Sequence, residues 1–139
     1  MIVGIGIDLI SNHRIKKIIQ KFNNQFKNKI FSAHELHDFE KRFGNKQALD
    51  APEIINFFAK RFCAKEAFSK ALGTGIGRGI NFNDIEVYND QMGKPLIRII
   101  NDKATLIKQI IGCENFNIHL TITDEKSISG AVVIIEKTI

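Results

Sequence analysis

The segment Phe62-Cys-Ala-Lys-Glu-Ala-Phe-Ser-Lys-Ala-Leu-Gly-Thr-Gly75 places two opposite charges on a mostly apolar stretch. At 3.6 residues per helical turn, Glu66 and Lys70 lie one turn apart, and Glu66 projects from an arc of apolar side chains within residues 55–63. A carboxylate in an apolar arc costs free energy unless a charge or a metal compensates it. Two interpretations stay open: Glu66 is a functional residue, or it forms a partly buried ion pair with Lys70.

The composition is typical of a soluble globular protein. The 139 residues are 44% hydrophobic and 25% charged, and we expect residues 1–139 to form one domain. No apolar run approaches the ~20 residues that span a bilayer, and the N-terminus reads as a strand rather than a signal peptide. Cys63 and Cys113 indicate neither a disulfide framework nor a metal site, so a reducing cytoplasm is the simplest location.

The net charge of +5 and a pI of about 9.3 predict an acidic partner or simply a solvated basic face. The excess lies in the N-terminal half and includes Lys60, Arg61 and Lys65, which point away from the apolar arc. A nucleic-acid-binding domain is one alternative. The aromatics, however, are 11 Phe spaced like core residues, with one Tyr and no Trp, rather than a basic stripe interleaved with exposed aromatics.

Residues 2–8 predict a strand with Val3, Ile5, Ile7 and Leu9 on one face and small residues on the other. Gly4 and Gly6 lack side chains, so another element can approach closely, and the alanine-containing helix is the best candidate. Asp8 would then emerge just beyond that contact, near Glu66.

Capping signals and periodicity place the other elements. Ser11 can cap one helix, Ser32 to Glu35 is a capping box, and Pro52 and Gly73 bracket the long helix. A loop is expected over 44–51. Helices and strand pairs joined by short turns favour an α+β fold with an antiparallel sheet. The expected helices are 12–22, 33–42, 52–72 and 102–111, and the further strands are 84–88, 96–100, 116–123 and 129–137.

Two glycine patterns are weak as motifs. Gly4-Ile-Gly6 lacks the third glycine and the strand-to-helix turn of a dinucleotide fingerprint. Residues 73–79 lack the Gly-Lys-Ser/Thr ending of a P-loop; they either let the backbone approach a phosphate or form a plain helix stop and turn. Asp8 and Glu66 carry more chemistry, because two carboxylates completed by water and phosphate oxygens are a usual Mg²⁺ site. Lys70 beside them would neutralise charge on a phosphoryl group.

Together these segments resemble the holo-acyl-carrier-protein synthases, the small bacterial type of 4′-phosphopantetheinyl transferase. The similarity spans nearly the whole chain, and the Lys-Glu-Ala-x-x-Lys core with its upstream Gly-Ile-Asp is its most specific part. It is carried by Gly4-Ile-Gly-Ile-Asp-Leu9, Ala59-Lys-Arg-Phe-Cys-Ala-Lys-Glu-Ala-Phe-Ser-Lys-Ala-Leu-Gly-Thr-Gly75, Gly93-Lys-Pro95, His119-Leu-Thr-Ile-Thr-Asp-Glu125 and Ala131-Val-Val-Ile-Ile-Glu136.

The resemblance implies an antiparallel sheet packed on a long central helix and an enzyme of fatty acid biosynthesis. The 4′-phosphopantetheine arm of coenzyme A would pass to a serine of the acyl carrier protein, leaving adenosine 3′,5′-bisphosphate. Asp8 and Glu66 match the family's Mg²⁺ ligands, and Lys70 matches the lysine near the phosphates. Glu66, directly or through a metal-bound water, would take the serine proton. Retention of these three residues argues against a non-catalytic assembly module.

The resemblance also implies the binding surfaces. The family's usual homotrimer places coenzyme A between neighbouring subunits, and the basic helix after Asp8 would receive the acidic carrier, with no nucleic acid or membrane as partner. Two departures are an Asp124 where many members have histidine, and a longer segment at 45–53. The matching coenzyme A positions are Arg61, Ser69, Lys70, Gly73, Thr74 and Pro95, and the carrier-facing residues are Arg14, Lys17 and Lys21.

Overall fold

The computed structural model describes residues 1–44 and 50–139, which form two antiparallel sheets and a set of helices around one long helix. Residues 45–49, which belong to the expected loop 44–51 and to the longer segment 45–53, lie outside the described residues. Within the described part, no helix combines the length and the apolar character needed to cross a membrane.

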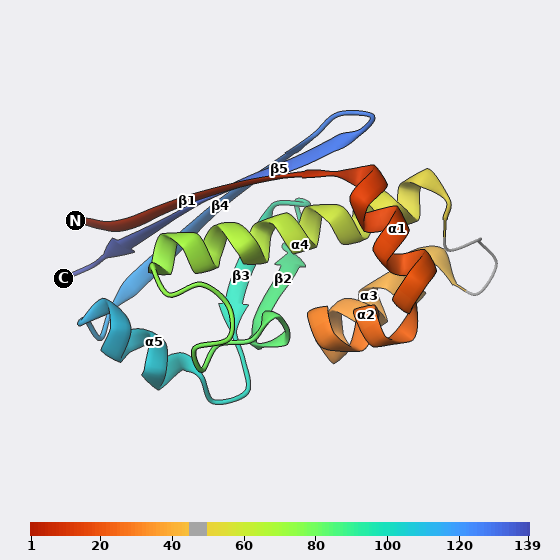
Figure 1. The fold of residues 1–139 in the computed structure, drawn as a ribbon. Helices are drawn as coiled ribbons and strands as arrows, with labels where there is room; N and C mark the ends of the chain where they lie inside the picture. The colour runs from red at the N-terminus through yellow and green to blue at the C-terminus, as the bar shows by residue number, and fades with distance from the viewer. Residues whose placement is uncertain (45–49) are drawn as a thin grey trace.

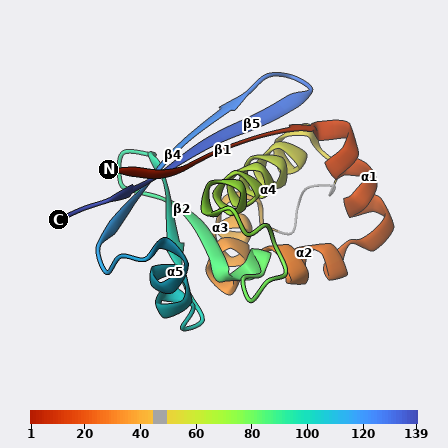
Figure 2. The same ribbon diagram turned by 60° about the vertical axis from the view of Figure 1, so that its left-hand side comes forward.

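Helix α4 lies along one face of the larger sheet, as Figure 1 shows, and Figure 2 presents this helix nearly end-on beneath the strands. The strand order of this sheet is β1-β5-β4, with all neighbours antiparallel, and β2 and β3 form a separate hairpin. The expected α+β class is therefore confirmed. The elements are β1 (Ile2–Ser11), α1 (Asn12–Phe22), α2 (Asn24–Ile30), α3 (Ala33–Phe43), α4 (Pro52–Leu72), η1 (Phe82–Asp84), β2 (Ile85–Asn89), β3 (Pro95–Ile99), α5 (Ala104–Ile111), β4 (Phe116–Asp124) and β5 (Ile128–Lys137).

The predicted close contact between the N-terminal strand and the long helix is present. A Cβ atom added to Gly4 would lie 1.8 Å from the Ala71 carbonyl oxygen, and one added to Gly6 would lie 1.9 Å from that of Ala67. No other residue type fits this backbone-to-backbone approach. The opposite face of β1 is exposed and carries the predicted apolar row Val3, Ile5, Ile7 and Leu9.

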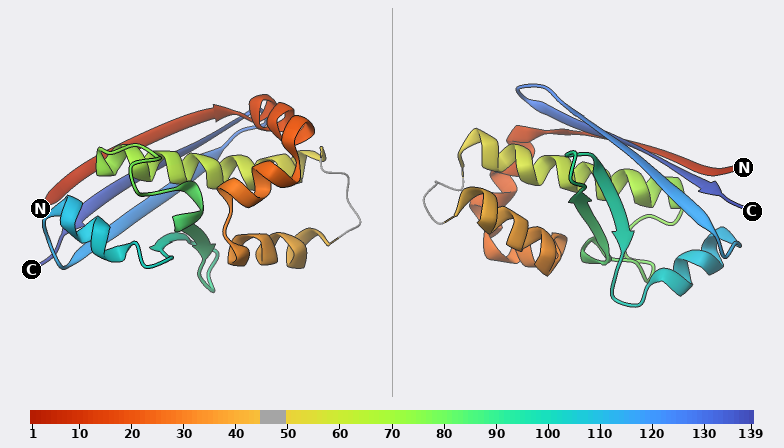
Figure 3. Two further views of the ribbon diagram at one scale, coloured as in Figure 1. Left: turned by 60° about the horizontal axis from the view of Figure 1, so that its bottom comes forward. Right: turned by 180° about the vertical axis from the view of Figure 1, so that it is seen from behind.

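The core continues under the N-terminal half of α4, where helices α1 to α3 gather (Figure 3). Phe58 is fully buried, and its ring centroid lies 4.9 Å from those of both Phe31 and Phe39. Helix α3 begins with the predicted capping box between Ser32 and Glu35. Aromatic packing thus fixes α2 and α3 against the helix that carries the candidate site.

Several local expectations need correction. Helix α2 and the short helix η1 are not predicted by the sequence pattern, since each spans two turns or fewer and gives little periodic signal. Ser11 occupies the predicted cap position of α1 but makes no side-chain capping bond. Arg61 and Lys65 do not belong to a basic surface, because both are buried, at 4% and 0% exposure.

Candidate active site

Strand β1 and helix α4 bring Asp8 and Lys70 together. The Lys70 ammonium donates to Asp8 Oδ1 at 3.0 Å and to the Ile7 carbonyl oxygen at 3.0 Å. In the part of the chain that the structure describes, the ion pair of Lys70 is therefore with Asp8. The alternative interpretation, an ion pair between Lys70 and Glu66 along the helix, is therefore wrong.

Glu66 lies half-buried beside this pair. Burial raises its pKa, the negative charge of Asp8 raises it further, and the positive charges of Lys70 and Arg14 oppose both effects. The two carboxylates therefore share one electrostatic environment, in which the lysine and the arginine only partly compensate them. Such a site favours an additional cation.

The donor set fits Mg²⁺. Asp8 and Glu66 offer hard carboxylate oxygens, and Mg²⁺ is commonly held by one or two carboxylates with the rest of its shell from water and phosphate. Across residues 1–44 and 50–139 there is no group of three His, Cys, Asp or Glu side chains that could form an all-protein cage. Burial and the charge of Asp8 raise the pKa of Cys63 to about 12, so this neighbouring thiol stays protonated and is a poor metal ligand.

A second cluster surrounds Arg61 on the side of α4 that faces the β2–β3 hairpin. Its guanidinium carbon lies 3.5 Å from the Phe57 ring centroid, and the group donates to Phe57 O and Asn89 Oδ1, each at 3.3 Å. Its Nε is buried without a partner among the described residues, and burial lowers the Arg61 pKa to about 10, which leaves it cationic at neutral pH. Arg61 therefore places a positive charge beside the hairpin.

The pocket at Arg61 has a volume of about 200 Å³ and contains Pro95, as the resemblance implies. Asp124 also lines this pocket, and its Oδ2 accepts a hydrogen bond from Asn56 Nδ2 at 3.0 Å. The residue that departs from the family pattern therefore lies in the same pocket as Arg61 and Pro95. Sequence patterns do not predict that the other polar members lie together, because they come from three separate parts of the chain. These members are Arg42, Lys60 and Asn89.

The remaining coenzyme A positions lie at the C-terminal end of α4. Ser69 is buried and its hydroxyl donates to the Glu66 carbonyl oxygen at 2.8 Å. Gly73 ends the helix with a φ of 84°, and the Thr74 hydroxyl donates to Gly75 O at 3.1 Å. With a rise of 1.5 Å per residue, Gly73 lies about 18 Å along α4 from Arg61. Within a single chain, the two groups of predicted coenzyme A residues are therefore far apart.

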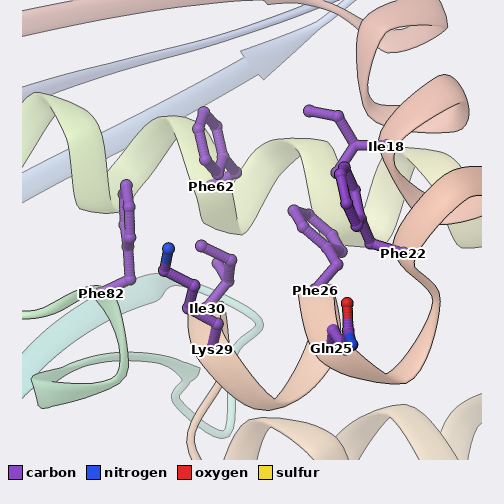
Figure 4. A pocket seen from close by; sticks show the side chains of 8 residues that line it. All are labelled: Ile18, Phe22, Gln25, Phe26, Lys29, Ile30, Phe62 and Phe82. Carbon is purple, nitrogen blue, oxygen red and sulfur yellow. The ribbon is translucent and has the colours of Figure 1, made fainter.

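An apolar pocket of about 370 Å³ adjoins the basic face of α1. Arg14, Lys17 and Lys21 are exposed. Figure 4 shows side chains from α1, α2, α4 and the η1 region turned toward this pocket. On α4, Phe62 precedes Glu66 by one turn, so the pocket lies next to the carboxylate site. The lining residues are Ile18, Phe22, Gln25, Phe26, Lys29, Ile30, Phe62 and Phe82.

Comparisons with known proteins find relatives that are similar in both sequence and fold. The model of the 4′-phosphopantetheinyl transferase superfamily matches residues 4–123. A holo-[acyl-carrier-protein] synthase of Pelagibacter ubique is 40% identical over 136 residues, covering 98% of each chain. The holo-[acyl-carrier-protein] synthase structure from Neisseria meningitidis has a TM-score of 0.84 at 34% identity, covering 99% of this chain and 100% of that one. A Bacillus anthracis holo-(acyl-carrier-protein) synthase, solved in complex with CoA (3′,5′-ADP), has a TM-score of 0.75 at 37% identity and 99% coverage of both.

Proposed function

We propose that this chain, which belongs to the 4′-phosphopantetheinyl transferase superfamily, transfers the 4′-phosphopantetheine group of coenzyme A to a serine of an acyl carrier protein. Adenosine 3′,5′-bisphosphate would be released, and the product would serve fatty acid biosynthesis. The observation that carries the proposal is the cluster of Asp8, Glu66 and Lys70 at the contact of β1 with α4. Residues 1–139 would act as one catalytic domain, and the two free cysteines suit a reducing cytoplasm.

Asp8 and Glu66 would hold Mg²⁺, which would stabilise negative charge on the pyrophosphate of coenzyme A. Lys70 is half-exposed and already placed beside Asp8, so its ammonium can also reach a phosphate oxygen bound there. Glu66 is a half-buried carboxylate beside Asp8 and Lys70, so it can act as a general base at this site. Glu66 would accept the proton of the serine hydroxyl as this oxygen attacks the phosphorus nearest pantetheine.

Arg61 and Pro95 would bind coenzyme A at the anionic end of the substrate. The positive charge around the pocket supports this role, because Arg42, Lys60 and Arg61 all line it. The Bacillus anthracis relative in complex with CoA (3′,5′-ADP) supports the same substrate. Lys70, Ser69, Gly73 and Thr74 would contact the pyrophosphate region from the other end of α4.

A homotrimer with sites at subunit boundaries would reconcile the two separated groups of coenzyme A residues. The outer face of β1 supports self-association, because Ile5, Ile7 and Leu9 are 62%, 59% and 68% exposed in one continuous row. Contiguous apolar rows of this kind usually mark an interface. One copy would then supply Glu66 and Lys70, and its neighbour the pocket containing Arg61 and Pro95.

The carrier protein would dock on α1. Arg14, Lys17 and Lys21 present positive charge to an acidic partner. On the same helix, Ile18 and Phe22 line the apolar pocket between α1 and α4, next to Glu66. This combination complements an acidic helix that presents an apolar side chain, and it brings the carrier to the edge of the carboxylate site.

Incubation with coenzyme A, Mg²⁺ and apo carrier protein tests the proposal. The intact mass of the carrier should rise by one phosphopantetheine, and adenosine 3′,5′-bisphosphate should appear in equal amount by chromatography. Chelation of Mg²⁺, Asp8→Ala and Glu66→Ala should each abolish the mass change, whereas Glu125→Ala in the exposed turn should not. A wild-type protein that leaves the carrier mass unchanged at saturating Mg²⁺ would refute the function.

A further inference from the structure

Lys65, the neighbour of Glu66 in sequence, is a fully buried cation with a complete set of acceptors. Its ammonium donates to Ile30 O at 2.5 Å, to Glu35 Oε1 at 2.5 Å and to Phe82 O at 3.1 Å. A lysine ammonium has three N–H donors, so each is used. The side chain is 0% exposed and belongs to none of the groups assigned above to substrate or metal.

Two of these acceptors belong to walls of the apolar pocket beside α1. Ile30 is the last residue of α2 and Phe82 the first of η1, and the side chains of both line the pocket (Figure 4). Phe82 is also held through its ring, which stacks on Phe62 with centroids 5.3 Å apart. Helix α4 therefore fixes Phe82 at two points, by Lys65 at its carbonyl and by Phe62 at its ring.

Glu35 supplies the compensating charge without reaching the pocket itself. It is 0% exposed, and its Oε1 accepts from both Lys65 Nζ and the backbone N–H of Ser32. Burial raises the pKa of Glu35 and lowers that of Lys65, while each partner's charge opposes the shift. The Glu35 carboxylate thus makes burial of the Lys65 ammonium possible. The bonds from this ammonium to the carbonyl oxygens of Ile30 and Phe82 then fix two walls of the pocket.

We propose that Lys65 is a positioning residue for carrier docking: its bonds to the carbonyl oxygens of Ile30 and Phe82 set the separation of two walls of the apolar pocket. The inference rests on the proposed docking of the carrier at α1 and this pocket. Lys65 touches neither coenzyme A nor the reacting atoms in this scheme. Its loss should therefore weaken recognition of the carrier and leave the chemical step intact.

Stability and positioning are separable here. Replacing both members of a buried ion pair by apolar residues of similar size is often neutral for stability, whereas removing one partner leaves an unpaired buried charge and destabilises the fold. Lys65→Met with Glu35→Leu leaves no unpaired buried charge and should therefore fold, with a lower melting temperature because the Ser32 N–H loses its acceptor. This double variant should also lack the two carbonyl bonds of Lys65. Glu35→Gln should be less stable but keep them.

The KM values for carrier and coenzyme A are measured for both variants, below the melting temperature of each. The double variant should raise the carrier KM roughly tenfold, equivalent to about 1.4 kcal/mol, with kcat and the coenzyme A KM near wild type. Glu35→Gln should keep the wild-type carrier KM despite its lower melting temperature. Glu86→Leu with Arg98→Met is the matched control. That pair joins a buried carboxylate to an exposed guanidinium and also contacts Ser32 through Glu86, but it bonds neither of the two wall carbonyls.

An unchanged carrier KM in the double variant would overturn the proposal, as would a rise in the coenzyme A KM or a tenfold effect of Glu35→Gln. If the variants fail to fold, carrier binding to the wild-type protein gives a test that needs no turnover. Excess carrier added to wild type should shift the methyl NMR signals of Ile18 and Ile30, and unmoved signals would refute the role of the pocket. An inactive wild type whose methyl signals still move would count against the proposed function alone.

Discussion

Replacing Gly6 by alanine should damage both the fold and the proposed metal site, because the added methyl group points at the backbone of α4. The new Cβ would lie 1.9 Å from Ala67 O and 2.5 Å from Ala71 N, and neither helix atom can move independently. Ordinary contact begins at 3.4 Å, so strand and helix must separate by about 1.5 Å. Asp8 follows on the same face of β1 and would move away from Glu66 and Lys70.

Overpacking of a tight core costs about 1–3 kcal/mol, and rigid backbone on both sides places this substitution at the upper end. For a chain of this length, a loss of about 3 kcal/mol lowers the melting temperature by roughly 10 °C. Calorimetry measures that change, and electron paramagnetic resonance with Mn²⁺ measures the accompanying loss of metal affinity. Gly130→Ala is the matched control, since its Cβ would meet Leu9 Cδ2 at 2.8 Å, the far end of an exposed side chain.

A Gly6→Ala protein with the melting temperature and Mn²⁺ affinity of wild type would refute the reasoning. So would an equal loss in the Gly130→Ala control, because the damage would then not depend on the contact with α4.

Four further outcomes are expected. Burial and the charge of Asp8 raise the pKa of Glu66, so the ionised carboxylate destabilises the folded protein at neutral pH. Glu66→Gln should therefore raise the melting temperature of the metal-free protein at pH 7. The gain should vanish below pH 4.5, where the carboxyl is protonated in both the folded and the unfolded protein. A lower melting temperature at pH 7 would contradict this. Lys70→Ala should lower kcat more than it alters either KM in steady-state assays, and an unchanged kcat would indicate a structural ion pair with Asp8. Lys21→Glu should raise the carrier KM above that of wild type at low salt, and the two KM values should converge at high salt. Lys21 is a better choice than Arg14 for this test, because the charge of Arg14 also acts on Glu66. Ile5→Asp should convert the proposed trimer to monomers, as measured by light scattering, and a trimeric variant would exclude the outer face of β1 as the interface.

The sequence predicts the long helix and its neighbours well because their signals are local. Pro52 and Gly73 mark the ends of α4 as found, and the capping box at Ser32 and Glu35 is present. The glycines of β1 predict the contact with α4 because a strand without side chains on one face requires a close neighbour. Both inferences need only the residues of one segment.

The sequence does not predict where the charged side chains of α4 lie in the folded protein. Periodicity assigns Arg61 and Lys65 to a polar surface, yet both are buried. Their burial depends on partners distant in the chain, namely the carbonyl groups of Ile30 and Phe82 for Lys65 and the amide of Asn89 for Arg61. Backbone acceptors leave no trace in a pattern of residue types, so such sites appear only in three dimensions.

The adjacent positions of Lys65 and Glu66 make α4 intolerant of changes in length. One residue inserted or deleted between Arg61 and Lys65 would rotate everything after it by about 100° around the helix axis. The inward ammonium would leave its three acceptors, and the carboxylate beside Asp8 would be carried out of the site in the same event. A point substitution on α4 affects one of these functions at a time. A frame-preserving codon insertion there should disable the pocket, the proposed metal site and the proposed phosphate contacts together.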